Sequence, residues 1–180
     1  MILHKYNPNW IHDFNKVKEK IEGALWPIKV SILHVGSTSV PGLSAKPIID
    51  IDLVFCSNIG FEEIKNCLEK IGYFHNGNQG IDNREVFKRK KGINLDNILD
   101  VVNHHLYACP EGSKELERHL LFKDYLITNA EACIQYERLK FELAQEARQD
   151  PKTYALLKEL KGKEFINDCI SKSKINNFLF

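Results

Sequence analysis

The sequence predicts an α+β fold, in which a mixed β-sheet flanked by helices is followed by a helical C-terminal third. Two apolar runs of strand length, residues 29–35 and 48–55, lie in the first third of the chain. Beyond residue 113, good helix formers recur with a helical period. The composition break at residues 110–113 separates an expected α+β core, residues 1–110, from a helical region, residues 111–180, that we expect to pack on it as one compact unit.

Each element follows from its periodicity and its flanking turn residues. We expect helices at residues 8–25, 61–71, 114–126, 130–148 and 153–170. We expect strands at residues 29–35, 48–55, 73–75, 84–90 and 98–109, with a short helix or turn at residues 37–43. Asn7 or Asn9 is a candidate N-cap of the first helix, and Ser113 of the third. Pro151 suits a first helical turn.

Composition limits the possible partners. The formal net charge is +1 with 27% charged residues, so there is no global basic excess of the kind that nucleic-acid binding favours, although a local patch stays open. No apolar run approaches the roughly 18 residues of a membrane span, and the N-terminus has no signal-peptide layout. We therefore expect a cytoplasmic protein with no membrane partner. The five scattered cysteines form no Cys-x-x-Cys pair, which favours free thiols over a zinc or redox site.

Two acidic residues in the second apolar run are the main candidates for chemistry. Asp50 and Asp52 are two positions apart on an expected strand, so their side chains project from the same face. The run is apolar on both faces, as in a strand covered on both sides, so the two carboxylates should lie close together and partly buried. Such a pair raises at least one pKa unless a cation or a donor compensates. The pair therefore favours Mg2+ or Mn2+ over the alternative, an ordinary charged strand face.

A phosphate site is expected beside these acids. Gly36 and Ser37 follow the first strand, where backbone N–H groups of a glycine-containing turn suit a phosphate. Lys46 lies just before the second strand and could bind phosphate as a point charge; a solvated loop lysine is the alternative. We also expect His34 to orient the Gly36–Ser37 turn through a hydrogen bond.

A Gly-Ser pair followed after a short helix by Asp-x-Asp resembles the signature of the nucleotidyltransferase superfamily. The longer string at residues 34–52, HVGSTSVPGLSAKPIIDID, resembles a narrower group, the GrpB family. The agreement extends from about Tyr6 to Ile170 and includes YNPNW at 6–10, HHL at 104–106, RHLLFKDYL at 118–126, and Tyr136 with Leu139 and Lys140. The resemblance implies a nucleotidyltransferase-like sheet, a nucleotide substrate and a Mg2+ cofactor.

The resemblance also indicates a departure from the superfamily. Polymerase-type members usually carry a third carboxylate on the strand beside Asp-x-Asp, whereas the similarity to GrpB proteins puts His105 there. Asp100 would have to lie out of register to substitute. His105 could ligate a divalent metal or act as a general base. The alternatives are a hydrogen-bonded core histidine, and a site that has kept binding but lost catalysis.

Basic residues elsewhere are weaker candidates. Residues 88–91, KRKK, fit a solvated edge strand, with contact to a triphosphate or polynucleotide as the alternative and Arg89 as its best candidate. Arg118 and Lys140 could reach the substrate from the helical region, while the family pattern around Arg118 also implies structural anchoring or a pocket wall.

We therefore predict a metal-dependent nucleotidyltransferase that moves a nucleoside monophosphate from a triphosphate to an unknown acceptor. Asp50, Asp52 and His105 are the predicted catalytic residues, and Asp50 and Asp52 the predicted metal ligands. Gly36, Ser37, Lys46, Arg89 and Arg118 are the predicted substrate contacts. The alternatives are a non-catalytic nucleotide- or metabolite-binding module on the same fold and, less favoured, an RNA-associated factor using residues 88–91.

Overall fold

The structure, a computed structural model, describes residues 1–56, 59–90, 92 and 97–178. Its described strands form one mixed sheet in the order β1-β2-β5-β4-β3. β2 and β5 are parallel, and the other neighbouring pairs are antiparallel. The strands are β1 (Val30–Val35), β2 (Ile49–Phe55), β3 (Tyr73–His75), β4 (Glu85–Arg89) and β5 (His104–Pro110).

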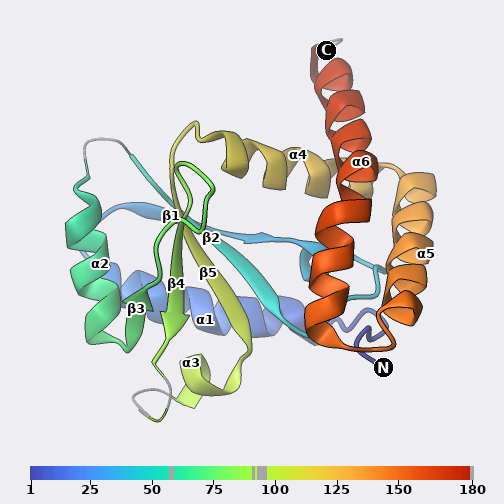
Figure 1. Ribbon diagram of the computed structural model, residues 1–180. Coiled ribbons are helices and arrows are strands. Elements are labelled where there is room, and N and C mark those ends of the chain that lie inside the picture. Colours follow the sequence, from blue (N-terminus) through green and yellow to red (C-terminus); the bar gives the residue numbers. More distant parts are fainter. Residues whose placement is uncertain (57–58, 91, 93–96, 179–180) are drawn as a thin grey trace.

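The helices lie in two groups. Figure 1 shows α1 crossing behind the strands, α2 at the β3 side, and the last three helices together at the opposite side, with the end of α6 projecting from the body. The bounds are α1 (Asn9–Leu25), α2 (Phe61–Lys70), α3 (Asn97–Val101), α4 (Lys114–Thr128), α5 (Ala130–Glu146) and α6 (Pro151–Phe178), with a short 3-10 helix η1 (Ser37–Ser39). No helix in the described ranges has the length and apolar character needed to cross a bilayer.

The main core lies between α1 and the sheet. The buried side chains of α1 recur every three or four residues, as one face of a helix requires. They pack with Ile49, Ile51 and Leu53 of β2, which are at most 2% exposed. Because side chains alternate along a strand, Asp50 and Asp52 project from the opposite face of β2.

The helical region packs against the segment that leads into β2. Val40 and Leu43, just after η1, are buried in one cluster with Leu126, Tyr136 and Cys169 from α4, α5 and α6. The N-caps fix where two of these helices begin: the N–H of Leu116 donates to Ser113 Oγ over 3.3 Å, and that of Ala132 to Asn129 Oδ1 over 2.9 Å. The C-terminal helices lie on the acidic side of β2, where His119 of α4 contacts Asp52.

The predicted architecture, a mixed α+β sheet with a helical C-terminal part, is confirmed, and most element bounds agree within two residues. The predicted cap at Ser113 is confirmed, and Pro151 lies in the first turn of the last helix as expected, although that helix begins two residues before the predicted bound of 153. The prediction that Asn7 or Asn9 caps α1 is confirmed in part: α1 begins at Asn9 after Pro8, which makes no side-chain cap bond, but Asn7 Oδ1 accepts the N–H of Asn9 over 3.0 Å. The last helix runs further than predicted, to Phe178.

One strand prediction was wrong in its first half. Residues 97–101 form α3, and β5 begins only at His104. Leu99 is 2% exposed and packs in the α1 core with Ile98 and Val102 beside it, a spacing that suits a helical turn as well as a strand. Of the connection expected before it, residues 91 and 94–96 lie outside the described residues. Asp100 is therefore on a helix and not on β5.

Candidate functional site

The two acids lie together on the face of the sheet opposite α1. The strand register pairs Asp50 with His105 and Asp52 with Tyr107 across β2 and β5. The side chain of Asp50 is 30% exposed, whereas that of Asp52 is completely buried. The structure thus brings both predicted carboxylates and His105 to one face of the sheet, with Asp50 partly open to solvent and Asp52 enclosed.

Gly36 lies directly against the first of these acids. Its φ is +71°, and a Cβ at this position would be 2.3 Å from Asp50 Oδ2. Only glycine has both the conformational freedom and the small size that this approach needs. The turn is closed by the Ser39 hydroxyl, which donates to the Gly36 carbonyl over 2.7 Å. The Gly-Ser turn and the Asp-x-Asp pair are therefore one contiguous structure.

His34 holds the Gly36–Ser37 turn through a hydrogen bond. Its Nε2 is 3.0 Å from Thr38 Oγ1, the expected hydrogen bond between this histidine and the turn, and its ring stacks on Phe14. Burial, with a contribution from the charge of Lys123, lowers the pKa of His34 to about 4. His34 is therefore neutral at pH 7.

The buried acid has a cationic partner that was not predicted from the sequence. His119 Nδ1 donates to Asp52 Oδ2 over 2.8 Å, and its Nε2 is 3.4 Å from Glu115 Oε1. Burial by itself lowers the pKa of His119, but the hydrogen bonds to Asp52 and Glu115 outweigh it and raise the pKa to about 9. An imidazolium therefore lies between two carboxylates at neutral pH. The signal available in the sequence was His119 in the family pattern around Arg118, which we interpreted as structural anchoring or a pocket wall.

One oxygen of Asp52 is left without a partner. Asp52 Oδ1 is buried and accepts no hydrogen bond from the described residues. Such an oxygen costs about 1–3 kcal/mol, and a divalent cation is a partner of suitable chemistry. The described residues contain no group of three or more His, Cys, Asp or Glu side chains arranged to hold a metal ion. The arrangement fits an ion bound by two carboxylates and completed by water and substrate oxygens, as Mg2+ prefers.

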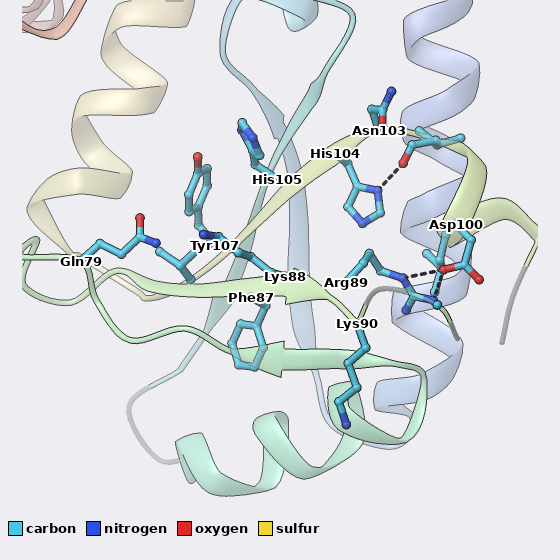
Figure 2. A pocket seen from close by; sticks show the side chains of 14 residues that line it. Gln79, Phe87, Lys88, Arg89, Lys90, Asp100, Asn103, His104, His105 and Tyr107 are labelled. Atoms are coloured by element: carbon cyan, nitrogen blue, oxygen red, sulfur yellow. Dashed lines mark hydrogen bonds and ion pairs between the residues drawn. The ribbon is translucent and has the colours of Figure 1, made fainter. Parts of the chain in front are cut away.

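His105 lies where two cavities meet. Its Nδ1 is 2.9 Å from Asp50 Oδ1, and its side chain is 52% exposed. Cavities of about 530 Å3 and 440 Å3 are both lined by Asn103, His104 and His105. The larger extends over β4 (Figure 2), and the smaller reaches Lys46 and Pro151. Nε2 of His105 has no hydrogen-bond partner among the described residues. The imidazole is thus held at one nitrogen, with space beside it.

Two lysines reach the same area from the helical region. Lys140 of α5 is 1% exposed, and its Nζ donates to the Ser44 carbonyl and, over 3.4 Å, to Ser37 Oγ. Burial, with the charge of Lys158, lowers the pKa of Lys140 to about 7. Half-buried Lys158 of α6 has its pKa raised, first by Tyr136 and also by Asp50. Lys140 belongs to the GrpB-like sequence pattern, whereas no motif marks Lys158.

Lys46 holds the helical region to the core. Its Nζ donates to the Pro151 carbonyl over 3.0 Å and lies 4.5 Å from the centre of the Tyr154 ring. It thus lies on the smaller cavity, as a tie between the β2 entry and the start of α6. Its contact with a phosphate stays a prediction.

The structure does not bring the two predicted arginines to the acids. Arg89 Nε donates to Asp100 Oδ1 over 3.0 Å, so Asp100 is also unavailable as a third acid of the site. Arg118 joins α4 to α6, with Nη1 2.8 Å from Asn167 Oδ1 and Nε 3.3 Å from Glu115 Oε2. Their contacts with substrate stay predictions.

The sheet, the Gly-Ser turn and the Asp-x-Asp strand define a nucleotidyltransferase-like fold. The crystal structure of Cid1 poly(U) polymerase with Mg 3′-dATP bound matches it with a TM-score of 0.55 over 85% of this chain and 49% of that chain. At 11% identity, this likeness shows the fold alone.

This chain belongs to the GrpB family, whose model, GrpB protein, matches residues 1–172. It is 31% identical over 175 residues to the glutamate-rich protein GrpB of Alkalihalophilus pseudofirmus, covering 93% of this chain and 95% of that one. It is 34% identical to the UPF0157 protein YqkA of Bacillus subtilis over 77% of this chain, but spans only 38% of YqkA. The crystal structure of the conserved protein GrpB from Enterococcus faecalis, at 27% identity, has a TM-score of 0.77 over 95% of this chain and 98% of that one.

Proposed function

We propose that this protein is a metal-dependent nucleotidyltransferase that transfers a nucleoside monophosphate from a triphosphate to an acceptor. The observation that carries the proposal is the contact between the Gly36 backbone and the Asp50 carboxylate, with an unpartnered oxygen of Asp52 beside it. A backbone turn for phosphate and a carboxylate pair for a cation are then adjacent, as phosphoryl transfer requires. The shared fold with Cid1, solved with a Mg nucleotide, supports the same class of substrate.

Asp50 and Asp52 would hold the ion, Mg2+ or Mn2+. When bound, it neutralises the charge that develops on the phosphates during transfer. His119 fixes the orientation of Asp52 through the 2.8 Å hydrogen bond and balances part of its charge. The pair therefore presents less net negative charge to a triphosphate than two free aspartates would.

The cations opposite the acids suit the triphosphate. Ser37 offers a hydroxyl at the turn, Lys140 lies 3.4 Å from that hydroxyl, and Lys158 is near enough to Asp50 for its pKa to respond. A phosphate between the turn and these lysines would gain charge-assisted hydrogen bonds. Phosphate binding would also favour the charged form of Lys140, whose burial otherwise disfavours it.

His105 is the candidate base. With Nδ1–H donating to Asp50 Oδ1, the neutral ring has its lone pair on Nε2, which faces no protein partner in the described residues. In the proposed step, an acceptor hydroxyl attacks the α-phosphorus, the bond to pyrophosphate breaks, and the hydroxyl proton passes to Nε2. Most of the rate gain would come from positioning and charge neutralisation.

The test is nucleotide binding and turnover in paired variants. Calorimetry with Mg2+ and a non-hydrolysable triphosphate should show binding to the wild-type protein and at least tenfold weaker binding to the double variant Asp50→Asn with Asp52→Asn. Asp13→Asn, a surface aspartate on α1, is the matched control and should bind as the wild type does. Unchanged binding in the double variant would show that the two carboxylates do not contribute to nucleotide binding.

The second candidate is a non-catalytic nucleotide-binding module. The observation in its favour is that His105, and not a carboxylate, is opposite Asp50 on β5. Incubation with labelled nucleoside triphosphates and mixed acceptors separates the two candidates. Transfer to any acceptor supports the enzyme, whereas tight binding without transfer or pyrophosphate release supports the module.

A further inference from the structure

A row of side chains crosses the sheet from the acids toward β4. Asp50 on β2 pairs with His105 on β5, and on β4 Val86 pairs with Tyr107 and Phe87 with Leu106. Continuing that register by one residue puts Lys88 opposite His105, on the same face as Val86 and Tyr107. Across the adjacent strands β2, β5 and β4, the row therefore consists of the Asp50 carboxylate, the His105 imidazole and the Lys88 ammonium group.

The spacing of the row is short. Neighbouring strands are about 4.8 Å apart, so the Lys88 backbone is roughly 5 Å from that of His105 and roughly 10 Å from that of Asp50. Figure 2 shows Lys88 on the side from which His105 and Tyr107 project, whereas the side chains of Phe87 and Lys90 point to the other side. Lys88 is exposed, and the described residues give it no hydrogen bond or ion pair.

The larger cavity lies over this row. Its volume is about 530 Å3, and its lining includes Lys88, His105, Tyr107, Asn103 and Gln79. This volume is within the range of small-molecule sites, about 300–1,000 Å3. The lining offers an aromatic ring, two amides and three basic residues, of which Arg89 is paired with Asp100 and Lys90 points to the other side of β4 (Figure 2), so Lys88 is the cation on the side of the candidate base. Such a surface suits a polar, negatively charged ligand.

We propose that this cavity binds the acceptor, and that the acceptor is a small phosphorylated compound whose phosphate contacts Lys88 while a nearby hydroxyl reaches His105. The inference rests on the proposed transferase function and specifies its second substrate. In the step, the acceptor oxygen forms its bond to the α-phosphorus, pyrophosphate leaves, and the hydroxyl proton goes to His105. The short row requires the phosphate to lie only a few bonds from the reacting hydroxyl.

The charges around the cavity favour a small acceptor over a polynucleotide. The neighbouring cation, Arg89, is paired with Asp100, and Lys90 is directed away. A polynucleotide is usually held by a track of cations along several phosphates. One available ammonium, in a chain of net charge +1, matches a single phosphate better.

The test measures acceptor binding without nucleotide or metal. The probes are glycerol 3-phosphate and glucose 6-phosphate, each beside its unphosphorylated parent, and a mixed-sequence single-stranded RNA. Calorimetry and amide shifts in two-dimensional NMR should show that at least one phosphorylated probe binds, with shifts at Asn103, His105 and Tyr107, while its parent binds at least tenfold more weakly. Lys88→Gln should weaken that binding at least fivefold. Lys70→Gln, which removes the same charge from an exposed position at the end of α2 that does not line the cavity, should change it less than twofold.

Several results would overturn this inference. They are binding of no phosphorylated probe at millimolar concentration, equal losses in the two lysine variants, and RNA binding that depends on Lys88 and exceeds that of every small probe. Failure of the transferase proposal has a different signature. In that case, substitution of Asp50 and Asp52 would leave nucleotide binding unchanged, while the phosphorylated probe would still bind at Lys88.

Discussion

The backbone of Gly36 lies against the carboxylate of Asp50, so closely that a methyl group on Gly36 would come within 2.3 Å of Oδ2. This contact joins two segments that are close to each other in the sequence but suit different ligands. The turn at Gly36 suits a phosphate, and the Asp50 carboxylate suits a metal ion. The geometry of the site therefore requires a residue without a side chain at position 36.

Gly36→Ala should therefore destabilise the protein and disable the site together. The added Cβ meets Asp50 at a φ of +71°, a conformation that is also unfavourable for alanine. We expect a loss of about 2–4 kcal/mol in the free energy of unfolding and no measurable nucleotide binding. Urea unfolding and calorimetry test this.

Gly23→Ala is the matched control for that change. Gly23 is inside α1, and a Cβ there meets nothing within 4 Å. The same substitution should stabilise the protein by about 0.5–1 kcal/mol. Equal effects of the two substitutions would mean that the contact with Asp50 does not matter.

His119→Gln should change how stability depends on pH. A histidine whose pKa rises from 6.5 to about 9 on folding contributes stability that is complete below pH 6.5 and is lost as the pH rises through 9. The full contribution is at most on the order of 3 kcal/mol. Glutamine can still donate to Asp52 but does not titrate.

The measurement is urea unfolding of both proteins at pH 6 and at pH 9.5. The stability advantage of the wild type over His119→Gln should be large at pH 6 and nearly absent at pH 9.5. Comparing the two proteins cancels the titration of other groups. Parallel curves would show that the Asp52–His119 pair is not an ionic one.

Lys140 should make nucleotide binding depend on pH above neutrality. Its pKa is lowered to about 7 by burial, and a bound phosphate would favour the charged form. The affinity should then fall by up to about tenfold per pH unit between pH 7 and 9. This range lies above the second phosphate ionisation, near about pH 6.

Lys140→Met should bind the nucleotide more weakly at pH 7 and show no such slope. Calorimetry in buffers of different ionisation enthalpy gives the proton uptake directly. Lys152→Met, an exposed lysine at the start of α6, is the control and should keep the slope. A wild-type affinity that is constant from pH 7 to 9 would contradict a role for Lys140 at the phosphates.

His105→Ala should separate chemistry from binding. If His105 takes the acceptor proton, its loss should lower kcat by about 100- to 10,000-fold, while the affinity for the nucleotide, held by other groups, changes little. The measurement is pyrophosphate release beside nucleotide calorimetry. His12→Ala, an exposed histidine on α1, is the control. A drop in affinity with kcat unchanged would make His105 a binding residue.

Much of the site could be predicted because its key contacts are close in the sequence. Period-two alternation puts Asp50 and Asp52 on one face of a strand whatever surrounds them. The sequence between Gly36 and Asp50 is short enough for the turn and the strand to meet. The strand expected at residues 98–109 was wrong in its first half because periodicity was ambiguous there. The spacing of Ile98, Leu99 and Val102 fits both the helical and the strand period, and packing on α1 selected a helix.

The partners of these side chains could not be predicted in the same way. His119 is 67 residues from Asp52, and Lys140 is 103 from Ser37, so each pairing depends on how α4 and α5 dock on the sheet. Packing of α4 against α6 brings Arg118 to Asn167, while β4 and α3 together pair Arg89 with Asp100. A charged side chain can be identified from the sequence, but the neighbour that neutralises it depends on long-range contacts.

By itself, the sequence determined the α+β class, most element bounds and the common face of the two acids, because these depend on periodicities within a few residues. Only the tertiary structure decided which acid is buried, which cations remain available and where the cavities lie. Those properties arise from packing between elements distant in the chain, where burial and charge pairing set the energy of each polar group.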